Sequence, residues 1–445
     1  MQPLQSATAD PLHGMVSVPG DKSISHRAIL LAAMTVGETE IEGLLEGEDV
    51  LRTVAALRTL GVEITETVDG KRRLYGVGIG GLAEPNGVLD FGNSGTGVRL
   101  MAGLLATHPF TSVLTGDVSL RHRPMARIII PLEQMGARLL ARVGSCLPMT
   151  VEGTAEPIPI SYQLPMPSAQ VKSAILLAGL NTPGRTTVIE PIATRDHTER
   201  LLTYLGARVE VSDSPEDGRV IEVVGQPELK GKKISIPSDP SSAAFLTVAA
   251  LLVPDSEITL TRVGANRLRT GFYLTLAKMG ATLDWQKKGE TCGEPVADLN
   301  VKASSLSAVE VPAALAPSMI DEYPVLAVAA AAAKGKTVLN GLAELRIKES
   351  DRITAISEGL RASGVKVEES EDSLVIHGHG GRVPGGGTVC TYLDHRIAMA
   401  FLVLGMASER PVRIDDVSMI ETSFPGFIDL VNGIGGRITN EGNGV

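Results

Sequence analysis

The stretch PSSAAFLTVAALLV, residues 240–253, decides how this sequence folds. It opens with a proline and two serines, which favour the start of a helix, and Thr247 is the one polar residue among the eleven that follow. A helix that is apolar on every face must be buried, and its alanines allow close packing against neighbours. Eleven residues are too few to cross a bilayer, which takes about 20. The stretch therefore predicts a buried helix of a globular protein.

Five other segments open in a similar way, with small or capping residues before an alanine-rich run. They begin at Asp21-Lys22-Ser23, Asn93–Thr96, Pro167–Gln170, Asp321–Pro324 and Asp394-His395-Arg396. The start of each helix leaves N–H groups unpaired and carries a positive dipole end, worth about 0.3–1 kcal/mol to an anion when exposed. We expect these helix starts to face one shared, electropositive gap that binds anions.

A second signature, a helix-like run followed by a glycine and a strand-like run, recurs six times. Its glycines are Gly61, Gly136, Gly206, Gly280, Gly364 and Gly435, which are 75, 70, 74, 84 and 71 residues apart. A glycine after the last helical turn is the expected left-handed cap. Each repeat is therefore predicted to contain a buried helix, strands, an outer helix and a returning strand. Six such repeats divide naturally into two domains of three.

The composition excludes several classes of function. The 445 residues hold 41 Lys and Arg against 51 Asp and Glu, a formal net charge of −10. A chain this acidic lacks the broad basic field of a nucleic-acid binder or a binder of anionic membranes. Cys146, Cys292 and Cys390 lie too far apart in sequence for a disulfide framework or a zinc pair. With no signal or transit pattern at the start and no histidine motif for a metal, we expect a cytoplasmic protein without metal.

Three basic segments are candidates for anion binding. Ser23 and Arg27 are four residues apart and share a helix face, so with Lys22 they would form an oxyanion grip. In GNSGTGVR, residues 92–99, three glycines allow backbone N–H groups to approach a ligand, although the ending of a Walker A loop is missing. The segment SLRHRPM, residues 119–125, is predicted to be a loop that presents charge. Helix capping and a solvated loop are the alternative interpretations.

Acidic and basic residues also gather in the last two repeats. Asp321 and Glu322 open a buried helix, KESDR at residues 348–352 follows in the same repeat, and Asp394-His395-Arg396 opens the next buried helix. Singly, these residues could be helix caps or surface ion pairs. Their clustering at equivalent repeat positions favours a functional role.

The string PGDKSISHRA, residues 19–28, is followed in order by GNSGTGVR, RPM, SAQVKSA, DEYP, KESDR and DHRIAMAF. Over about residues 14–435 this order resembles the family of 5-enolpyruvylshikimate-3-phosphate synthases. The resemblance implies an α/β fold, the two-domain inside-out α/β barrel of enolpyruvyl transferases, with six β-α-β-α-β-β repeats and buried helices. It implies a lower domain of residues 1–20 and 238–445, and an upper domain of residues 21–237.

The activity implied by this resemblance is transfer of the enolpyruvyl group from phosphoenolpyruvate to the 5-hydroxyl of shikimate 3-phosphate, with release of phosphate. The positions that match shikimate 3-phosphate binding are Lys22, Ser23, Arg27, Ser168, Gln170, Asp321 and Lys348. Those that match phosphoenolpyruvate binding are Lys22, Gly95, Arg123, Gln170, Arg352 and Arg396. The substrates are small anions, no cofactor is required, and the family implies a monomer that glyphosate inhibits.

The implied chemistry needs two acid–base groups, because C3 of the vinyl group gains a proton while the attacking hydroxyl loses one. Glu349 is the candidate for C3 and Asp321 for the 5-hydroxyl, while Lys22 would stabilise charge on the transferring oxygens. The chain departs from the family at Ala169, where some relatives have a second serine, and Arg195 is expected to compensate. It also has Thr422 where one branch has a lysine.

Two other functions remain alternatives. The related enolpyruvyl transferases that act on UDP-N-acetylglucosamine have an Asn after the first Lys and a Cys in the loop that corresponds to residues 120–124. Here Ser23 follows Lys22 and the loop contains Arg121-His122-Arg123. A non-catalytic anion-binding module would be expected to lack the acid–base pair, whereas Asp321 and Glu349 are both present.

Overall fold

The computed structural model describes residues 2–216 and 218–440, and contacts divide the chain into two compact units. Unit 1 consists of Met1–Pro19, Pro237–Gly289 and Pro295–Val445, and unit 2 of Gly20–Ile236 and Glu290–Glu294. The sequence-based division assigned residues 290–294 to the domain of residues 238–445, whereas contacts place them in unit 2. These residues belong to unit 2, where Oε1 of the buried Glu294 lies 2.7 Å from Nδ1 of His197.

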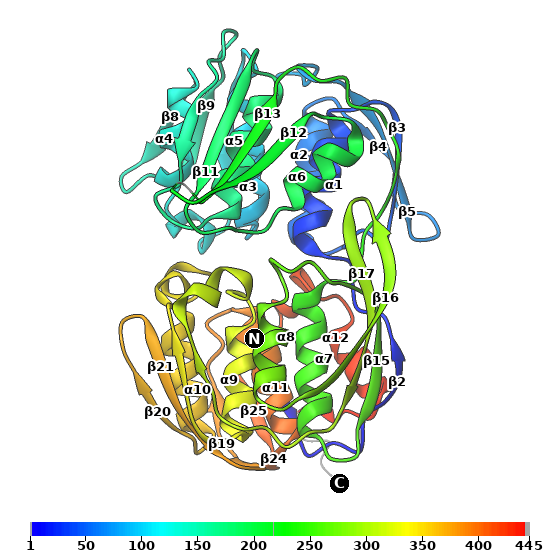
Figure 1. Ribbon diagram of the computed structural model, residues 1–445, viewed down its shortest axis with the longest axis vertical. Coiled ribbons are helices and arrows are strands. Elements are labelled where there is room, and N and C mark those ends of the chain that lie inside the picture. The colour runs from blue at the N-terminus through cyan, green and yellow to red at the C-terminus, as the bar shows by residue number, and fades with distance from the viewer. Residues whose placement is uncertain (1, 217, 441–445) are drawn as a thin grey trace. The chain divides into compact units, whose positions relative to one another are not determined.

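Each unit contains three inner helices. In unit 2 they are α1 (Lys22–Ala33), α3 (Gly95–Leu105) and α5 (Ala169–Leu180), and in unit 1 they are α7 (Pro240–Leu252), α9 (Tyr323–Ala332) and α11 (His395–Met406). The inner helices of unit 1 all contact one another, and Figure 1 shows them enclosed by the strands of that unit. Every residue of α11 is buried, which confirms the prediction of helices that are buried on all faces.

The small residues of the inner helices allow their backbones to approach closely. Gly103 of α3 faces Ala174 of α5, and a Cβ atom built on Gly103 would lie 2.3 Å from the Ala174 carbonyl oxygen. No side chain fits at that distance, so glycine is required at this crossing. The alanine and glycine content that the sequence shows is thus used for helix packing.

The inner helices begin where the capping residues predict. In five of them, the side-chain oxygen of the capping residue accepts a hydrogen bond from a backbone N–H of the first helical turn. These capping residues are Asp21, Ser94, Ser168, Asp239 and Asp394. Helix α9 differs, because Glu322 at its N-cap position binds the side chains of Ser241 and Arg269 instead.

Six outer helices complete the repeats. They are α2 (Glu48–Thr59), α4 (Ala126–Gln134), α6 (His197–Leu205), α8 (Gly271–Lys278), α10 (Arg352–Ala362) and α12 (Phe427–Gly433). The glycine of the repeat signature follows each of them with a φ between 82° at Gly364 and 120° at Gly435. The predicted left-handed caps are therefore confirmed in all six repeats.

The described residues of unit 2 form three four-stranded sheets. Their strand orders are β14 (Lys233–Ser235), β3 (Val36–Glu42), β5 (Lys71–Val77), β4 (Glu63–Ile64); β6 (Leu89–Asp90), β7 (Thr111–Thr115), β9 (Cys146–Glu152), β8 (Arg138–Arg142); and β10 (Ser161–Gln163), β11 (Arg185–Glu190), β13 (Gly218–Val224), β12 (Val209–Ser214). In each sheet the first pair is parallel and the other pairs are antiparallel. The segment β6-α3-β7-α4-β8-β9 thus has the expected β-α-β-α-β-β order.

In unit 1, the part of the chain that the structure describes forms three four-stranded sheets and a short parallel pair, β22 (Val383–Gly385) and β24 (Ser408–Arg410). The strand orders are β16 (Thr282–Thr291), β17 (Glu294–Lys302), β15 (Glu257–Gly264), β2 (His13–Val16); β18 (Glu310–Val311), β19 (Lys334–Asn340), β21 (Ser373–His379), β20 (Lys366–Glu369); and β23 (Thr388–Val389), β25 (Val412–Ile414), β1 (Leu4–Ser6), β26 (Ile438–Asn440). Strand β1 comes from the start of the chain and pairs with the last repeat on both sides, Leu4 opposite Ile414 and Asn440.

No helix among the described residues combines the length and the apolar character that a membrane crossing requires.

Candidate active site

In unit 2, the start of α1 holds Lys22 in an ion pair. Asp21 caps the helix through the Ile24 N–H, and Lys22 Nζ lies 3.0 Å from Oδ2 of Asp49 on α2. Asp49 was not singled out from the sequence, although it follows Glu48 in the acidic first turn of its helix. The ion pair fixes the ammonium of Lys22 at the positive end of α1.

Arg27, expected to form an oxyanion grip with Lys22 and Ser23, is buried and donates three hydrogen bonds. Its Nε donates to Thr198 Oγ1 at 2.7 Å, NH2 to Ser173 Oγ at 2.7 Å and NH1 to the Ser23 carbonyl at 2.9 Å. Burial lowers the pKa of Arg27 to about 10, and the charge of Glu199 opposes this shift. The guanidinium is therefore a buried support at the start of α1 rather than an exposed group on the face of Ser23.

Gly95 lies beside two guanidinium groups. A Cβ atom at this position would be 3.1 Å from NH1 of Arg123 and 3.1 Å from NH1 of Arg99. Arg123 is buried and donates to Asn93 Oδ1 at 2.6 Å, and its segment includes the 3₁₀ helix η1 (Leu120–His122). The expected charge-presenting loop is thus partly helical, and Arg123 is turned inward toward Asn93.

Gln170 joins this group from helix α5. Its Oε1 accepts from Arg99 NH1 at 2.7 Å, and its Nε2 donates to Thr96 Oγ1 at 2.9 Å. Arg99 is a residue that the sequence analysis did not select, although it ends the quoted GNSGTGVR string. Ser168 caps α5 two residues before Gln170, and the half-buried Arg195 lies in the segment between β11 and α6.

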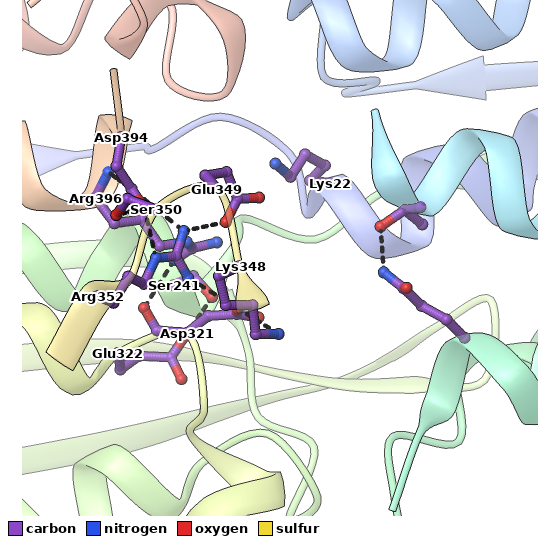
Figure 2. Close-up of polar contacts among 12 residues, drawn as sticks. Lys22, Ser241, Asp321, Glu322, Lys348, Glu349, Ser350, Arg352, Asp394 and Arg396 are labelled. Carbon is purple, nitrogen blue, oxygen red and sulfur yellow. Dashed lines mark hydrogen bonds and ion pairs between the residues drawn. The ribbon is translucent and has the colours of Figure 1, made fainter. Parts of the chain in front are cut away.

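In unit 1, Arg352 is surrounded by three carboxylates, as Figure 2 shows. Its NH2 lies 2.6 Å from Glu349 Oε2, its Nε 2.8 Å from Asp394 Oδ2 and its NH1 3.5 Å from Asp321 Oδ1. The Arg352 side chain is completely buried. Burial lowers the pKa of Arg352, but the charges of Asp394 and Glu349 outweigh burial and raise it. Arg352 therefore stays a cation.

Asp394 connects Arg352 and Arg396, the two arginines of unit 1 predicted to bind phosphoenolpyruvate. Its carboxylate accepts from Arg352, from the backbone N–H of Arg396 at 2.9 Å and from Ser350 Oγ at 3.1 Å. Burial opposes ionisation, but the charge of Arg352 outweighs it, so the pKa of Asp394 is lowered. Asp394 was part of a motif in the sequence but was not predicted as a site residue. A side chain that caps a helix and also holds an arginine cannot be distinguished by sequence from an ordinary cap.

Asp321 contacts the other two predicted cations of unit 1, Lys348 and Arg396. Its Oδ1 is 3.7 Å from Lys348 Nζ, and its backbone oxygen accepts from Arg396 NH1 at 3.2 Å. The five predicted residues of this unit thus belong to one network (Figure 2). They are Asp321, Lys348, Glu349, Arg352 and Arg396. Thr422 is buried, and its hydroxyl donates to the Met419 carbonyl at 2.7 Å.

Within the described residues, no group of three or more His, Cys, Asp and Glu side chains is placed to hold a metal ion. The networks of both units consist of fixed cations, carboxylates and helix starts. Such groups can bind anions and can transfer protons.

His26 provides a pH-dependent prediction for unit 2. It is buried on α1 with Nδ1 2.9 Å from Thr53 Oγ1, and burial, followed by the charges of Lys22 and Arg27, lowers its pKa to about 3. The unfolded-state pKa is about 6.5, so His26 contributes stability above that pH, and this contribution is lost as pH falls toward the folded-state pKa. From pH 6.5 to 5 the free energy of unfolding of the wild type should fall by about 1.6 kcal/mol more than that of His26→Gln, measured by urea unfolding. Parallel pH curves for the two proteins would contradict this.

The chain is similar to known proteins in family, sequence and fold. Residues 7–431 match the family described as EPSP synthase (3-phosphoshikimate 1-carboxyvinyltransferase). The chain is 60% identical over 441 residues, 99% of both chains, to a 3-phosphoshikimate 1-carboxyvinyltransferase of Paramagnetospirillum magneticum. It is similar to the structure of EPSP synthase from Acinetobacter baumannii, with a TM-score of 0.86 and 42% identity over 98% of this chain and 99% of that one.

A more distant likeness concerns the fold alone. The enolpyruvyl transferase NikO from Streptomyces tendae is 17% identical, with a TM-score of 0.77 over 98% of both chains. The expected enolpyruvyl transferase fold is thereby confirmed. The match of family, sequence and fold spans nearly the whole chain, and this chain belongs to the EPSP synthase (3-phosphoshikimate 1-carboxyvinyltransferase) family.

Proposed function

We propose that this protein transfers the enolpyruvyl group of phosphoenolpyruvate to the 5-hydroxyl of shikimate 3-phosphate and releases phosphate. Its family membership supports this reaction. The roles of individual residues are assigned mainly from the charged side chains around Arg352 in unit 1. There the carboxylates of Asp321 and Glu349 both form ion pairs with the buried guanidinium of Arg352. An anion-binding cation with a carboxylate on each side is suited to a substrate that must gain one proton while another is removed.

The proposed steps conserve atoms and charge. Glu349 gives a proton to C3 of phosphoenolpyruvate while the 5-hydroxyl oxygen bonds to C2 and its proton passes to Asp321. The tetrahedral intermediate then collapses: C3 returns a proton to Glu349, the C2–O bond to phosphate breaks, and the proton held by Asp321 passes to the departing phosphate. Lys22, held by Asp49, stabilises the negative charge on the transferring and leaving oxygens.

Substrate binding is assigned to cations and polar residues of both units. The residues assigned to binding shikimate 3-phosphate are Lys22, Ser23, Arg27, Ser168, Gln170, Arg195, Asp321 and Lys348. Those assigned to binding phosphoenolpyruvate are Lys22, Gly95, Arg123, Gln170, Arg352 and Arg396. Charge-assisted hydrogen bonds of about 1.5–3 kcal/mol each suffice for two phosphorylated carboxylates. A monomer in the cytoplasm remains the prediction for the state and location of the protein.

A phosphate-release assay tests the proposal. Phosphate should appear only when both phosphoenolpyruvate and shikimate 3-phosphate are present. Release with UDP-N-acetylglucosamine instead would favour the related transferase, which the residues Ser23 and Arg123 argue against. No release with either acceptor, despite binding, would indicate an anion-binding module.

Gly95→Ala should weaken the binding of phosphoenolpyruvate. The new methyl group would lie 3.1 Å from the guanidinium nitrogens of Arg123 and Arg99, tighter than ordinary van der Waals contact, so one of them must shift. We expect the KM for phosphoenolpyruvate to rise about tenfold, equivalent to about 1.4 kcal/mol. Glyphosate, an anion expected to compete for the same groups, should inhibit the variant less than the wild type in assays at matched substrate saturation. An unchanged KM and unchanged inhibition would remove Gly95 from the site.

A further inference from the structure

A fully buried lysine lies in unit 2 just behind the residues assigned to shikimate 3-phosphate. Lys172 is on α5, two residues after Gln170, and its side chain has no solvent exposure. Its Nζ is 2.9 Å from Glu190 Oε2 and 2.7 Å from Glu199 Oε1, and both glutamates are buried. The three side chains, called here the Lys172 triad, connect α5, the end of β11 and the first turn of α6.

One side of the triad holds the segment that carries Arg195. Glu190 accepts the hydroxyl and the backbone N–H of Thr194, and Lys172 Nζ donates to the Thr194 carbonyl at 3.4 Å. Thr194 is thus bound at its side chain, its N–H and its carbonyl, and the peptide bond that follows leads directly to Arg195. The direction in which Arg195 leaves the backbone is therefore set by Lys172 and Glu190.

The other side of the triad reaches Arg27. Glu199 follows Thr198, whose Oγ1 accepts from Arg27 Nε, and Ser173, next to Lys172 on α5, accepts from Arg27 NH2. Ser173 Oγ and Thr198 Oγ1 are themselves 2.7 Å apart. The two side chains that accept from the buried guanidinium thus belong to direct sequence neighbours of triad members.

We propose that Lys172 is a positioning residue for shikimate 3-phosphate, because its buried ammonium fixes the backbone of Arg195 and the two hydroxyls that hold Arg27. This role rests on the proposed function. Lys172 pairs with the two buried carboxylates of Glu190 and Glu199, and the charge of Glu199 also acts on the buried guanidinium of Arg27. Apolar residues of similar volume often fill a core at no cost in stability compared with a buried ion cluster. The benefit of the triad lies in the fixed directions of its hydrogen bonds.

The first experiment compares Lys172→Met with Arg72→Met. Arg72 is a matched control, since it is also buried in unit 2 and pairs with Glu46 at 2.9 Å, but it contacts none of the residues assigned to substrates. Lys172→Met should raise the KM for shikimate 3-phosphate about tenfold and change the KM for phosphoenolpyruvate less than about twofold. Arg72→Met should lower the melting temperature without raising the KM for shikimate 3-phosphate more than the KM for phosphoenolpyruvate. Equal effects of the two variants on both KM values would overturn the proposal.

The second experiment tests whether Lys172 acts through Arg195. Arg195→Ala alone should weaken the binding of shikimate 3-phosphate, and Lys172→Met should add little to it, because two residues that act through one contact are not additive. Full additivity in this cycle, or an unchanged affinity in Arg195→Ala, would contradict the proposed route.

Should Lys172→Met give no folded protein, Glu199→Gln takes its place, because it keeps the side-chain volume and the Glu190 ion pair. Glu199→Gln should likewise raise the KM for shikimate 3-phosphate more than the KM for phosphoenolpyruvate. A wild-type protein that releases no phosphate from the substrate pair would instead overturn the proposed function, so the two failures are distinguishable.

Discussion

Glu349→Gln is expected to lower kcat by about 10²–10⁴-fold, the usual contribution of positioned proton transfer. The amide oxygen of glutamine can still accept from Arg352 NH2, which lies 2.6 Å from Glu349 Oε2 in the wild type, so the network should persist. The amide has no proton of suitable acidity to give to C3. Steady-state kinetics measure the loss, and calorimetry should show unchanged binding of shikimate 3-phosphate.

The matched control for this variant is Glu358→Gln. Glu358 is on the same stretch of chain, in α10, and its contact is with the exposed Tyr392 hydroxyl rather than with the Arg352 network. Its kcat should equal that of the wild type. Wild-type turnover in Glu349→Gln would remove Glu349 from the mechanism.

Asp321→Asn should cause a loss in kcat of similar size, about 10²–10⁴-fold, for a different reason. The backbone oxygen of Asp321, which accepts from Arg396 NH1 at 3.2 Å, is unaffected by the substitution. The side chain keeps its shape near Lys348 but loses the basicity needed to take the proton of the 5-hydroxyl. Rapid-mixing measurements of phosphate release should show the slowed chemical step.

Asp372→Asn is the control for this second variant, since Asp372 is exposed and its backbone carbonyl accepts the Leu342 N–H. A kcat for Asp321→Asn within about twofold of the control would contradict its role as the base, because even a weak general base contributes about 100-fold.

The repeat architecture could be predicted from local signals. Gly61 and its five counterparts have the positive φ that a helix cap needs, and Asp21 or Ser168 begins a helix because its side chain accepts an N–H of the first turn. Strand pairing was not predictable in the same way. That Leu4 lies between Ile414 and Asn440 depends on contacts between the two ends of the chain, for which the repeat period contains no signal.

The candidate site could be predicted as a set of residues but not as a set of contacts. The motifs around Lys22 and Arg352 identified the cations, since charged residues at the starts of buried helices are unusual. The partners were missed because they come from distant segments: Asp49 is 27 residues from Lys22, and Asp394 is 42 residues from Arg352. The burial of Arg27 also depends on Ser173 and Thr198, more than 140 residues away in sequence.

The most direct measurement follows hydrogen at C3 when both substrates react in deuterium oxide. If a proton is first added to C3 and then removed, the three hydrogens of the transient methyl group become equivalent. Deuterium should therefore enter the methylene group of the product, and do so far more slowly with Glu349→Gln. A wild-type product whose methylene group carries no deuterium would contradict the addition and elimination on which these assignments rest.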